Sequence, residues 1–554
     1  MRPVARGIAT GDVGELLQTG MPMRGRRRVP VATLVLLLVA TAVLLVTARP
    51  VAETPSMAAS GAWPQDAVIY HVFVDRFAEG GPAGGGNSDA GAGDGGAADG
   101  GAADGGAADG GAADGGAAGE PSPNHDAALM DWMGGDLAGV RQRLDHVVEL
   151  GANTLWLSPV TPGPGYHGYH PTDLTDVDPR FGDRDELVAL VREAHARGVK
   201  VIYDLVLNHT SDQHPWFVAA RADCDGSPYV AWYEFRDCPD RYAGFAGLAE
   251  LPELDLDHPE VRAWVFDEVL PFWLDEIGVD GFRLDHAQGP SRAFWDAFRA
   301  EVDARWPGTF LLGEIWAQQT IIDSYGDVMD AATAFPLRDR LVAVVARGGD
   351  VRALHQPIVS LLEGDGPRPA TYVSSHDQPR FLTEAGGDRE RLALAYAALL
   401  TLPGVPVVYY GDEVGLGQSG DHRAVDTHQD RYFREPMSWD TSTWDLEVLD
   451  RVSRLARLRT TRPALYAGEY VPLVTEGDAL VFERVTDDGE RVLVVLATGN
   501  DAVSIDLTDL YGTEAAAELL LTDLLAGERA PAEVAAGELV VDPRGVGVWQ
   551  LTGS

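Results

Sequence analysis

The sequence predicts an α/β protein built as a (β/α)8 TIM barrel, with a subdomain inserted after strand 3 and a C-terminal all-β sandwich domain. Three observations predict this fold. Apolar runs with strand character alternate with amphipathic helical patterns over about 400 residues, as expected for a parallel barrel. Several of these runs end in ionisable residues, which is typical of the catalytic face of such a barrel. Beyond residue 465 the pattern changes to short β runs, and we place the sandwich at 465–554.

Composition narrows the classes of partner. The chain has 554 residues, with 85 acidic against 43 basic side chains and a formal charge of -42. A chain of this length exceeds one small domain, so we expect a large catalytic domain and a smaller module. Its negative field repels phosphate, which argues against nucleic acid or an anionic membrane surface as a partner. A neutral substrate carries no such penalty.

The first 60 residues carry an export pattern. A basic segment, Arg24 to Arg28, precedes an apolar run from Val29 to Val46, which is the order found in export signals. The run is about 18 residues long, between the length of a cleaved signal and that of a spanning helix. We therefore predict an export signal or membrane anchor and linker at 1–60, and a secreted or extracytoplasmic protein. Such a protein contacts a membrane only through this segment, if the segment stays uncleaved.

The barrel predicted at 61–464 is interrupted early. Its first strand begins at Ala67 and is followed at 78–119 by a segment in which DGGAA repeats from Asp94 onward. The segment has almost no apolar bulk, so it cannot bury enough surface to offset the entropy of ordering. We predict a disordered surface insertion and assign it no function.

One barrel helix can be delimited closely. Asp183 is a candidate N-cap with Glu186 three residues later, and Gly198 marks the end. The apolar stripe consists of Leu187, Leu190, Val191 and Ala194. Later strands are expected at 279–285, 309–314, 370–375 and 405–410.

The segment 209–254 breaks the alternation. It is rich in aromatic residues, Pro and Asp and shows no clear helical pattern, so we predict an inserted subdomain. Both cysteines of the chain, Cys224 and Cys238, lie here. In an exported protein they can form a disulfide worth about 3 kcal/mol, and the alternative is two free thiols. Two cysteines without a nearby pair of histidines make a poor zinc site.

The stretch VDGFRLDHA carries the first candidate site. Read as a strand with alternating faces, it places Arg283 and Asp285 side by side. A guanidinium keeps a neighbouring carboxylate ionised, as a carboxylate nucleophile requires, although a structural ion pair gives the same pattern. Three other apolar runs also end in ionisable residues, namely YDLVLNH at 203–209, LLGEIW at 311–316 and YVSSHD at 372–377. In a barrel these ends meet at one face, which favours a catalytic site.

Together the four stretches resemble the α-amylase family of retaining glycoside hydrolases, in its neopullulanase, cyclomaltodextrinase and α-amylase-like branch. The resemblance runs from about Ala62 to the C-terminal sandwich. It implies that Asp285 is the nucleophile, Glu314 the general acid/base and Asp377 a third carboxylate that binds sugar hydroxyls. It further implies substrate binding by Tyr169, Asp173, Asp204, His209, Arg283 and His376.

The implied mechanism explains these residue types. A retaining glycosidase needs one carboxylate to attack the anomeric carbon and one carboxylic acid to protonate the leaving oxygen, about 5 to 5.5 Å apart. Glu314 must then hold its proton near neutral pH, which burial and neighbouring carboxylates favour. Aromatic side chains can stack on sugar rings, and the candidates are Tyr169, Trp216, Trp232 and Trp316. For Trp216 and Trp232, packing inside the subdomain is an equal alternative.

Departures from the family pattern concern the branch and the metal. Ser375 stands where asparagine commonly precedes the last His-Asp, a change associated with the neopullulanase and cyclomaltodextrinase branch. Gln288 and Gly289 replace a Lys-His pair, which weakens one calcium ligand, while Asn208 remains a candidate ligand of a structural Ca²⁺. A second calcium site would have to use Glu79, Asn87 and Asp136. No organic cofactor is implied.

The sequence thus predicts an enzyme, a glycoside hydrolase of the α-amylase type. The expected reaction is cleavage of α-1,4-glucosidic linkages of starch, maltodextrins or related α-glucan oligosaccharides through a covalent glucosyl-enzyme intermediate. An α-glucanotransferase or sugar isomerase on the same barrel would use the same three acids, and the sequence does not separate these activities. A non-catalytic carbohydrate-binding barrel is the second alternative, and the presence of all three acids argues against it.

Overall fold

The computed structural model describes residues 63–81, 129–425, 428–526, 533–535 and 537–553. All of them belong to one compact unit, Ala62–Ser554. The export segment predicted at 1–60 and the repeat from Asp94 onward lie outside the described residues. Within the described part of the chain, no helix combines the length and apolarity that crossing a membrane requires.

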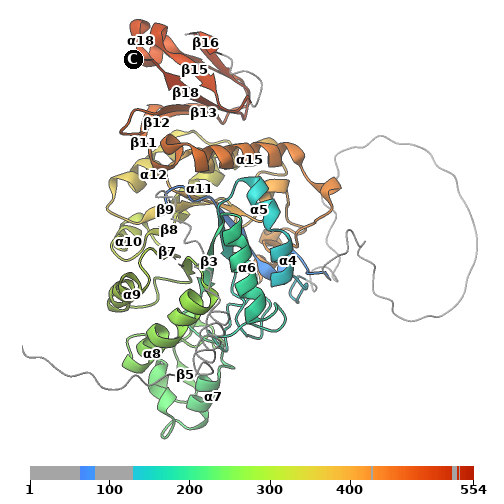
Figure 1. Cartoon of the computed structure of the whole chain (residues 1–554), viewed down its shortest axis with the longest axis vertical. Helices are drawn as coiled ribbons and strands as arrows, with labels where there is room; N and C mark the ends of the chain where they lie inside the picture. Colours follow the sequence, from blue (N-terminus) through green and yellow to red (C-terminus); the bar gives the residue numbers. More distant parts are fainter. Residues whose placement is uncertain (1–62, 82–128, 426–427, 527–532, 536, 554) are drawn as a thin grey trace, which may run out of the picture. The chain divides into compact units, whose positions relative to one another are not determined.

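A closed barrel of eight parallel strands forms the centre of the molecule (Figure 1). Around the barrel the strands follow the order β1-β10-β9-β8-β7-β6-β3-β2. Together with the C-terminal sheets, this barrel confirms the predicted fold class. The strands are β1 (Ile69–Val72), β2 (Thr154–Leu157), β3 (Lys200–Leu205), β6 (Gly281–Leu284), β7 (Phe310–Gly313), β8 (Ala331–Thr333), β9 (Arg368–Thr371) and β10 (Val405–Tyr409).

Inward-facing side chains fill the barrel because alternate residues of each strand point to its axis. The lower layers are apolar and consist mainly of Ile69, Ile202, Phe310, Leu312, Ala331, Val405 and Val407. Continuing the same alternation, Asp204 and Arg283 reach the upper end from neighbouring positions of β3 and β6. The barrel therefore changes from apolar to charged toward the C-terminal ends of its strands.

Helices cover the outside of the barrel (Figure 1). The helical segments are α2 (Val74–Phe77), α4 (Leu137–Gln142), α5 (Leu144–Leu150), α6 (Arg184–Ala196), α8 (Pro259–Trp264), η3 (Val265–Val269), η4 (Phe272–Ile277), α9 (Arg292–Arg305), α10 (Gln319–Asp323), α11 (Phe335–Leu341), η5 (Val342–Ala346), α12 (Arg352–Glu363), α13 (Phe381–Glu384), α14 (Arg389–Thr401), α15 (Leu446–Thr461) and α16 (Pro463–Ala467).

Helix α6 confirms the prediction made for it. Asp183 and Glu186 form a capping box at its start, and its buried residues are the four of the predicted stripe. Gly198 follows with a φ of +79°, a conformation that glycine adopts without strain. Strand β8 was not predicted, because its three residues are too few to show an alternating pattern.

The subdomain inserted after β3 is small. It contains α7 (Pro215–Ala222), η1 (Pro228–Trp232), η2 (Phe245–Gly247) and a two-stranded sheet of β4 (Phe235–Asp237) and β5 (Arg241–Tyr242). The expectation that this segment has no clear helix was wrong. Helix α7 begins with Pro215 in its first turn and His214 as its N-cap. Its buried residues are Phe217 and Ala220, too few to give an apolar stripe in the sequence. The cysteines form the disulfide Cys224–Cys238.

In its described residues, the long connection between β10 and α15 forms short 3-10 turns. These are η6 (Asp412–Val414), η7 (His422–Ala424), η8 (Gln429–Tyr432) and η9 (Thr441–Thr443). Residues 426–427 of this connection are not described.

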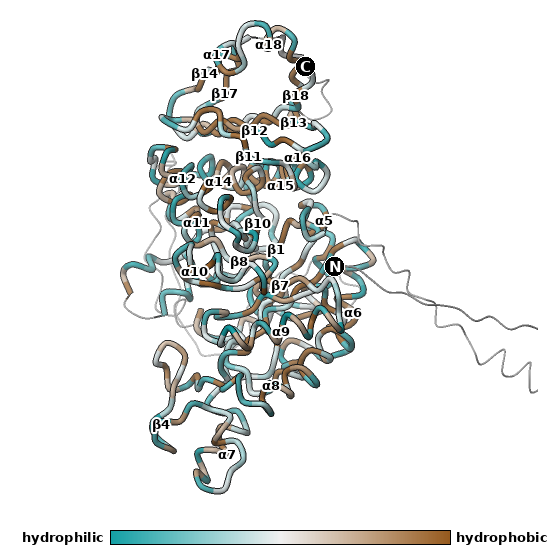
Figure 2. The backbone as a smooth tube through the Cα atoms, turned by 90° about the vertical axis from the view of Figure 1, so that its left-hand side faces the viewer, coloured by the Kyte–Doolittle hydropathy of each residue, from teal (hydrophilic) through white to brown (hydrophobic). Residues whose placement is uncertain are grey.

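The C-terminal module packs two sheets against each other. Its elements are β11 (Glu469–Val474), β12 (Ala479–Val485), β13 (Arg491–Ala497), β14 (Val503–Asp506), α17 (Leu507–Tyr511), α18 (Thr513–Glu518), β15 (Leu520–Asp523), β16 (Glu533–Ala535), β17 (Glu538–Val541) and β18 (Val546–Thr552). Six strands form the larger sheet in the order β11-β12-β13-β18-β15-β16, and β14 pairs with β17. Hydrophobic residues run along β12 and β13 of the larger sheet (Figure 2). The sandwich core joins Val481 and Val495 of this sheet to Ile505 and Leu539 of the smaller one.

Candidate active site

One guanidinium organises the first part of the site. Arg283 Nη1 lies 2.7 Å from Asp285 Oδ1 and 2.6 Å from Asp204 Oδ1. The register of β3 and β6 explains the second contact, because Asp204 and Arg283 are paired neighbours in the sheet. Asp285 follows β6 directly, and its backbone N–H donates to the carbonyl of Leu205. The alternation read from the sequence thus placed Arg283 and Asp285 side by side as expected.

Glu314 binds the other end of the same guanidinium. Its Oε1 lies 2.8 Å from Arg283 Nη2, and its Oε2 accepts the backbone N–H of His286 at 2.9 Å. Burial raises the pKa of Glu314 to about 8, and the charges of Asp285 and Asp377 act in the same direction against Arg283. Glu314 therefore holds a proton at neutral pH while it lies against a cation.

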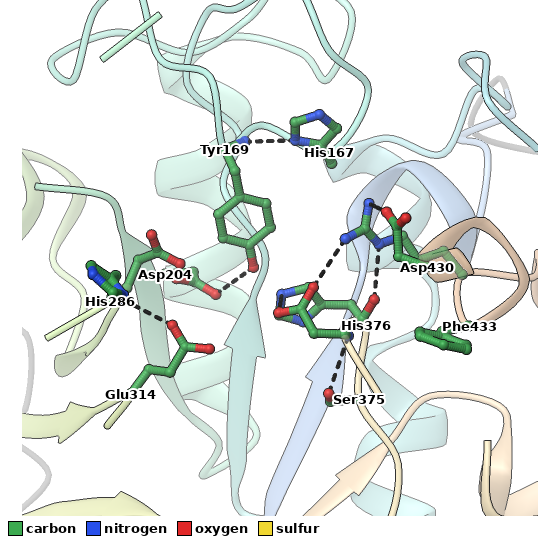
Figure 3. Close-up of polar contacts among 12 residues, drawn as sticks. His167, Tyr169, Asp204, His286, Glu314, Ser375, His376, Asp430 and Phe433 are labelled. Atoms are coloured by element: carbon green, nitrogen blue, oxygen red, sulfur yellow. Dashed lines mark hydrogen bonds and ion pairs between the residues drawn. The ribbon is translucent and has the colours of Figure 1, made fainter. Parts of the chain in front are cut away.

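Asp204 is fully buried beneath the site. It accepts hydrogen bonds from the Tyr169 hydroxyl at 2.8 Å and from Trp156 Nε1 at 3.1 Å, in addition to the Arg283 contact. Figure 3 shows the Tyr169 ring reaching down to Asp204, and the ring stacks on His376 with centroids 5.1 Å apart. Asp204 therefore orients both Arg283 and Tyr169 from below.

Asp377 and His376 enter from the loop after β9. His376 Nε2 lies 2.9 Å from Asp377 Oδ2, without the angles of a hydrogen bond. Burial opposes ionisation of Asp377, but the neighbouring His376 and Arg434 outweigh it and hold the pKa of that carboxyl well below its usual range. Glu314, Asp377 and Arg283 line one pocket at the upper end of the barrel.

His209 follows β3, at the start of the inserted subdomain. Its Nε2 is 3.1 Å from the carbonyl oxygen of Tyr169, and burial lowers the pKa of His209. The ring of Phe245 stacks on His209 with centroids 5.0 Å apart and meets His286 edge-on at 4.7 Å. The subdomain thus brings one aromatic side chain to the rim of the site.

Two predicted residues stand apart from this cluster. Asp173 is exposed, and its Oδ1 accepts hydrogen bonds from the N–H and hydroxyl of Thr175, so the structure does not join it to the carboxylates. Asn208 is buried against Gly289, where a Cβ would lie 2.0 Å from the amide oxygen. Gly289 is therefore required by the packing of Asn208.

The structure offers little support for a metal. Among the described residues, no group of three or more His, Cys, Asp or Glu side chains is arranged to hold one. Asp136 instead caps helix α4, accepting the N–H of Gly139 at 2.6 Å and of Gly80 at 2.9 Å, and Asn87 lies outside the described residues. A single amide at Asn208 falls short of the six to eight oxygen ligands that Ca²⁺ takes. Calcium binding stays a prediction.

The candidate aromatic residues differ in exposure. Trp316 is 54% exposed and stacks on Phe335 with centroids 4.4 Å apart, close behind Glu314 in the chain. Trp216 packs edge-on against Trp232 at 4.6 Å, inside an aromatic cluster of the subdomain. Trp316 therefore has an exposed indole close to the acid in the chain, whereas the other two tryptophans pack against each other.

Sequence reasoning missed two residues of the site. His71 on β1 is fully buried, stacks on Trp156 with centroids 3.8 Å apart and meets His376 edge-on. Its alternation with the inward-facing Ile69 is a signal that would have found it. Arg434 lies in the connection after β10 and contacts Asp377, and no local pattern marks it.

The arrangement combines a protonated carboxyl group with carboxylates around one cation. Glu314 can donate a proton and later accept one. Asp285, held by Arg283 beside it, is placed to act as a nucleophile. Acid and nucleophile contact different nitrogens of one guanidinium, so the two carboxyl groups lie close together.

Three comparisons relate this chain to known proteins. The family model "Alpha amylase, catalytic domain" matches residues 71–445. A cyclomaltodextrinase of Geobacillus thermopakistaniensis is 31% identical over 486 residues, which cover 85% of this chain and 74% of that protein. An intracellular maltogenic amylase of Bacillus subtilis is 30% identical over 406 residues, covering 70% and 66%. A solved ligand-free structure, the cyclic α-maltosyl-(1→6)-maltose hydrolase of Arthrobacter globiformis, has a TM-score of 0.70 at 28% identity and covers 88% of this chain and 99% of that one.

Proposed function

Because the chain belongs to the α-amylase family of glycoside hydrolases, we propose that it cleaves α-1,4-glucosidic linkages by a retaining mechanism through a covalent glucosyl-Asp285 intermediate. The substrates we propose are starch, maltodextrins or related α-glucan oligosaccharides. One observation carries the proposal, namely that Arg283 holds Asp285 at 2.7 Å and the protonated Glu314 at 2.8 Å. A retaining glycosidase requires this pairing of an ionised and a protonated carboxyl group.

The reaction follows from these positions. Glu314 gives its proton to the glycosidic oxygen as the bond from that oxygen to the anomeric carbon breaks. An Asp285 oxygen forms the new bond to that carbon from the opposite face. In the second step the ionised Glu314 takes a proton from water, whose oxygen attacks the anomeric carbon and releases Asp285. Asp377 stays ionised and accepts hydrogen bonds from hydroxyls of the bound sugar.

The related proteins support an α-glucan oligosaccharide as the substrate class. The Geobacillus thermopakistaniensis relative is a cyclomaltodextrinase, and the Arthrobacter globiformis neighbour hydrolyses a cyclic maltosyl-maltose. Both of these proteins act on small cyclic α-glucans. We therefore include cyclic maltodextrins among the substrates to be tested.

Export of this protein is a separate proposal. It rests on the basic and apolar order of residues 24–46 alone, and the Bacillus subtilis relative is an intracellular enzyme. Cell fractionation tests this proposal. Export predicts activity in the medium or on the external face of the cell membrane, and activity confined to the cytosol would contradict it.

A product time course tests the proposed activity. The purified chain would be incubated with maltoheptaose, a cyclodextrin, pullulan and sucrose, and the products would be separated by chain length. The proposal expects shorter maltooligosaccharides from maltoheptaose and ring opening of the cyclodextrin. Products longer than the substrate would instead show a glucanotransferase, and an isomer of sucrose would show an isomerase. Binding without turnover of any of the four would show a non-catalytic barrel.

A further inference from the structure

The site has a second buried guanidinium in addition to that of Arg283, and it belongs to Arg434. Its side chain is 7% exposed and comes from the connection between β10 and α15. Its Nε donates to the carbonyl oxygen of His376 at 3.0 Å, and Nη2 lies 3.1 Å from Asp377 Oδ1. Nη1 lies 2.6 Å from Asp430 Oδ2 and 3.3 Å from the Tyr166 hydroxyl. Figure 3 shows Asp430 close to His376 in this part of the site.

The guanidinium of Arg434 sets the orientation of Asp377 as well as supplying a positive charge. It binds the main chain at His376 and the side chain of Asp377 at the same time. A planar guanidinium holds two acceptors in a set geometry, whereas an ammonium acts as a point charge. The carboxylate of Asp377 is therefore held at a defined position relative to its own backbone.

The two arginines divide the carboxylates of the site between them. Arg283 contacts Asp204, Asp285 and Glu314, and Arg434 contacts Asp377. A carboxylate packed against a cation is left with an uncompensated charge when that cation is removed. Asp430, on the far side of Arg434, is 35% exposed, so it anchors the guanidinium at the edge of the site.

Several charged and titratable groups face Asp377 from different elements. They come from the loop of Asp377 itself, from the barrel strands and the residues after them, and from the loop after β2. Besides Arg434 they are His376, Arg283, Glu314, His71, His167, Tyr169 and Tyr372. Arg434 and Arg283 are the permanent cations among these groups. Arg434 is the one that contacts Asp377 directly.

We propose that Arg434 is a positioning residue of the reaction, which orients Asp377 and keeps its charge so that this carboxylate can bind the sugar in the transition state. The inference rests on the proposed function, because Asp377 acts in this way only if the chain cleaves α-glucans.

Kinetics of two substitutions at this position test the proposal. Arg434→Met removes the cation at similar length, and Arg434→Lys keeps a charge without the fork. Arg352→Met is the matched control, because Arg352 is 66% exposed on α12 and pairs with its neighbour Asp350, away from the site. For each full-length variant, kcat and KM on maltoheptaose would be measured between about pH 4 and pH 9, together with Tm.

The proposal expects a graded loss. Arg434→Met should lower kcat/KM about 10- to 100-fold, mostly through kcat, and Arg434→Lys should recover part of this. Without the Arg434 charge the pKa of Asp377 rises, so the acid limb of kcat/KM should move toward higher pH. Arg352→Met should match the wild type.

Two results would overturn the inference. One is an Arg434→Met protein with kcat/KM within about twofold of the wild type across this range. The other is an equal loss in both Arg434 variants with a lowered Tm and an unmoved acid limb, which would show a role in folding alone. A wild-type protein that cleaves no α-glucan would instead refute the proposed function. The two failures are told apart because the wild type is measured in the same experiment as the Arg434 variants.

Discussion

At the scale of single residues, neighbours decide which carboxyl group is the acid. Arg283 contacts both Asp285 and Glu314, so the cation alone does not distinguish them. Burial raises the pKa of Glu314 to about 8, and the charges of Asp285 and Asp377 act in the same direction against Arg283. Glu314 is thus protonated over the range in which most enzymes work.

The raised pKa of Glu314 predicts the basic limb of activity. Below a pH of about 8 the acid is protonated and the reaction proceeds, and above it the proton is lost. We expect kcat/KM to fall roughly tenfold per pH unit above that value. Glu314→Gln should lower kcat by several orders of magnitude and leave the circular dichroism spectrum unchanged. A flat profile up to pH 10, with Glu314→Gln still active, would show that another group is the acid.

Trp316 predicts an effect on binding. It is 54% exposed two residues after Glu314, and a stacking contact between aromatic rings, taken here as the scale for a sugar ring on the indole, is worth about 0.5–1.5 kcal/mol. Trp316→Ala should raise KM for maltoheptaose about 2- to 10-fold with little change in kcat. Leu446→Ala, at another exposed apolar position, is the control that should leave KM unchanged. An unaltered KM in Trp316→Ala would mean that this indole does not touch the substrate.

At the scale of elements, sequence reasoning succeeded where a local pattern carries the information. The strand alternation at Arg283 and the capping box of α6 are such patterns, and both appear in the structure. Helix α7 was missed because only two of its residues are buried, which gives no apolar stripe. Arg434 was missed for a different reason. Its contact with Asp377 spans 57 residues and depends on the closure of the barrel, which no local pattern encodes.

The disulfide ties the elements of the inserted subdomain together. Cys224 follows α7 and Cys238 follows β4, and the bond spans 14 residues. The double substitution to serine should destabilise this subdomain by about 3 kcal/mol, because a loop of this length is released in the unfolded state. Limited proteolysis should then cut between residues 221 and 241, while the barrel stays intact. Equal resistance of both proteins would show that packing of Phe217 and its neighbours suffices.

At the scale of the whole molecule, the C-terminal module completes the barrel. Residues 392–401 of α14 are buried on all sides, and a helix buried all round needs a cover on its outer face. Arg484 of β12 donates to the carbonyl of Thr401 at 2.8 Å, at the C-terminal end of this helix. The module thus both shields α14 and satisfies its end.

Removal of the module should therefore unfold the barrel. Deleting residues 465–554 exposes the outer face of α14, and exposing even three of its leucines costs about 5 kcal/mol. We expect an insoluble chain or a Tm lowered by many degrees. Deleting 94–116 is the matched control and should leave activity almost unchanged, because that repeat has almost no apolar bulk. A soluble truncated chain with the full-length Tm would contradict this role of the module.

The central claim is retention of the anomeric configuration through Asp285, and proton NMR of the first product tests it most directly. Maltoheptaose would be mixed with the purified chain in deuterated buffer, with Asp285→Asn as the inactive control. The account predicts that the α-anomer of the new reducing end appears first and then mutarotates. Initial release of the β-anomer would show direct displacement by water and would contradict a covalent glucosyl-Asp285 intermediate.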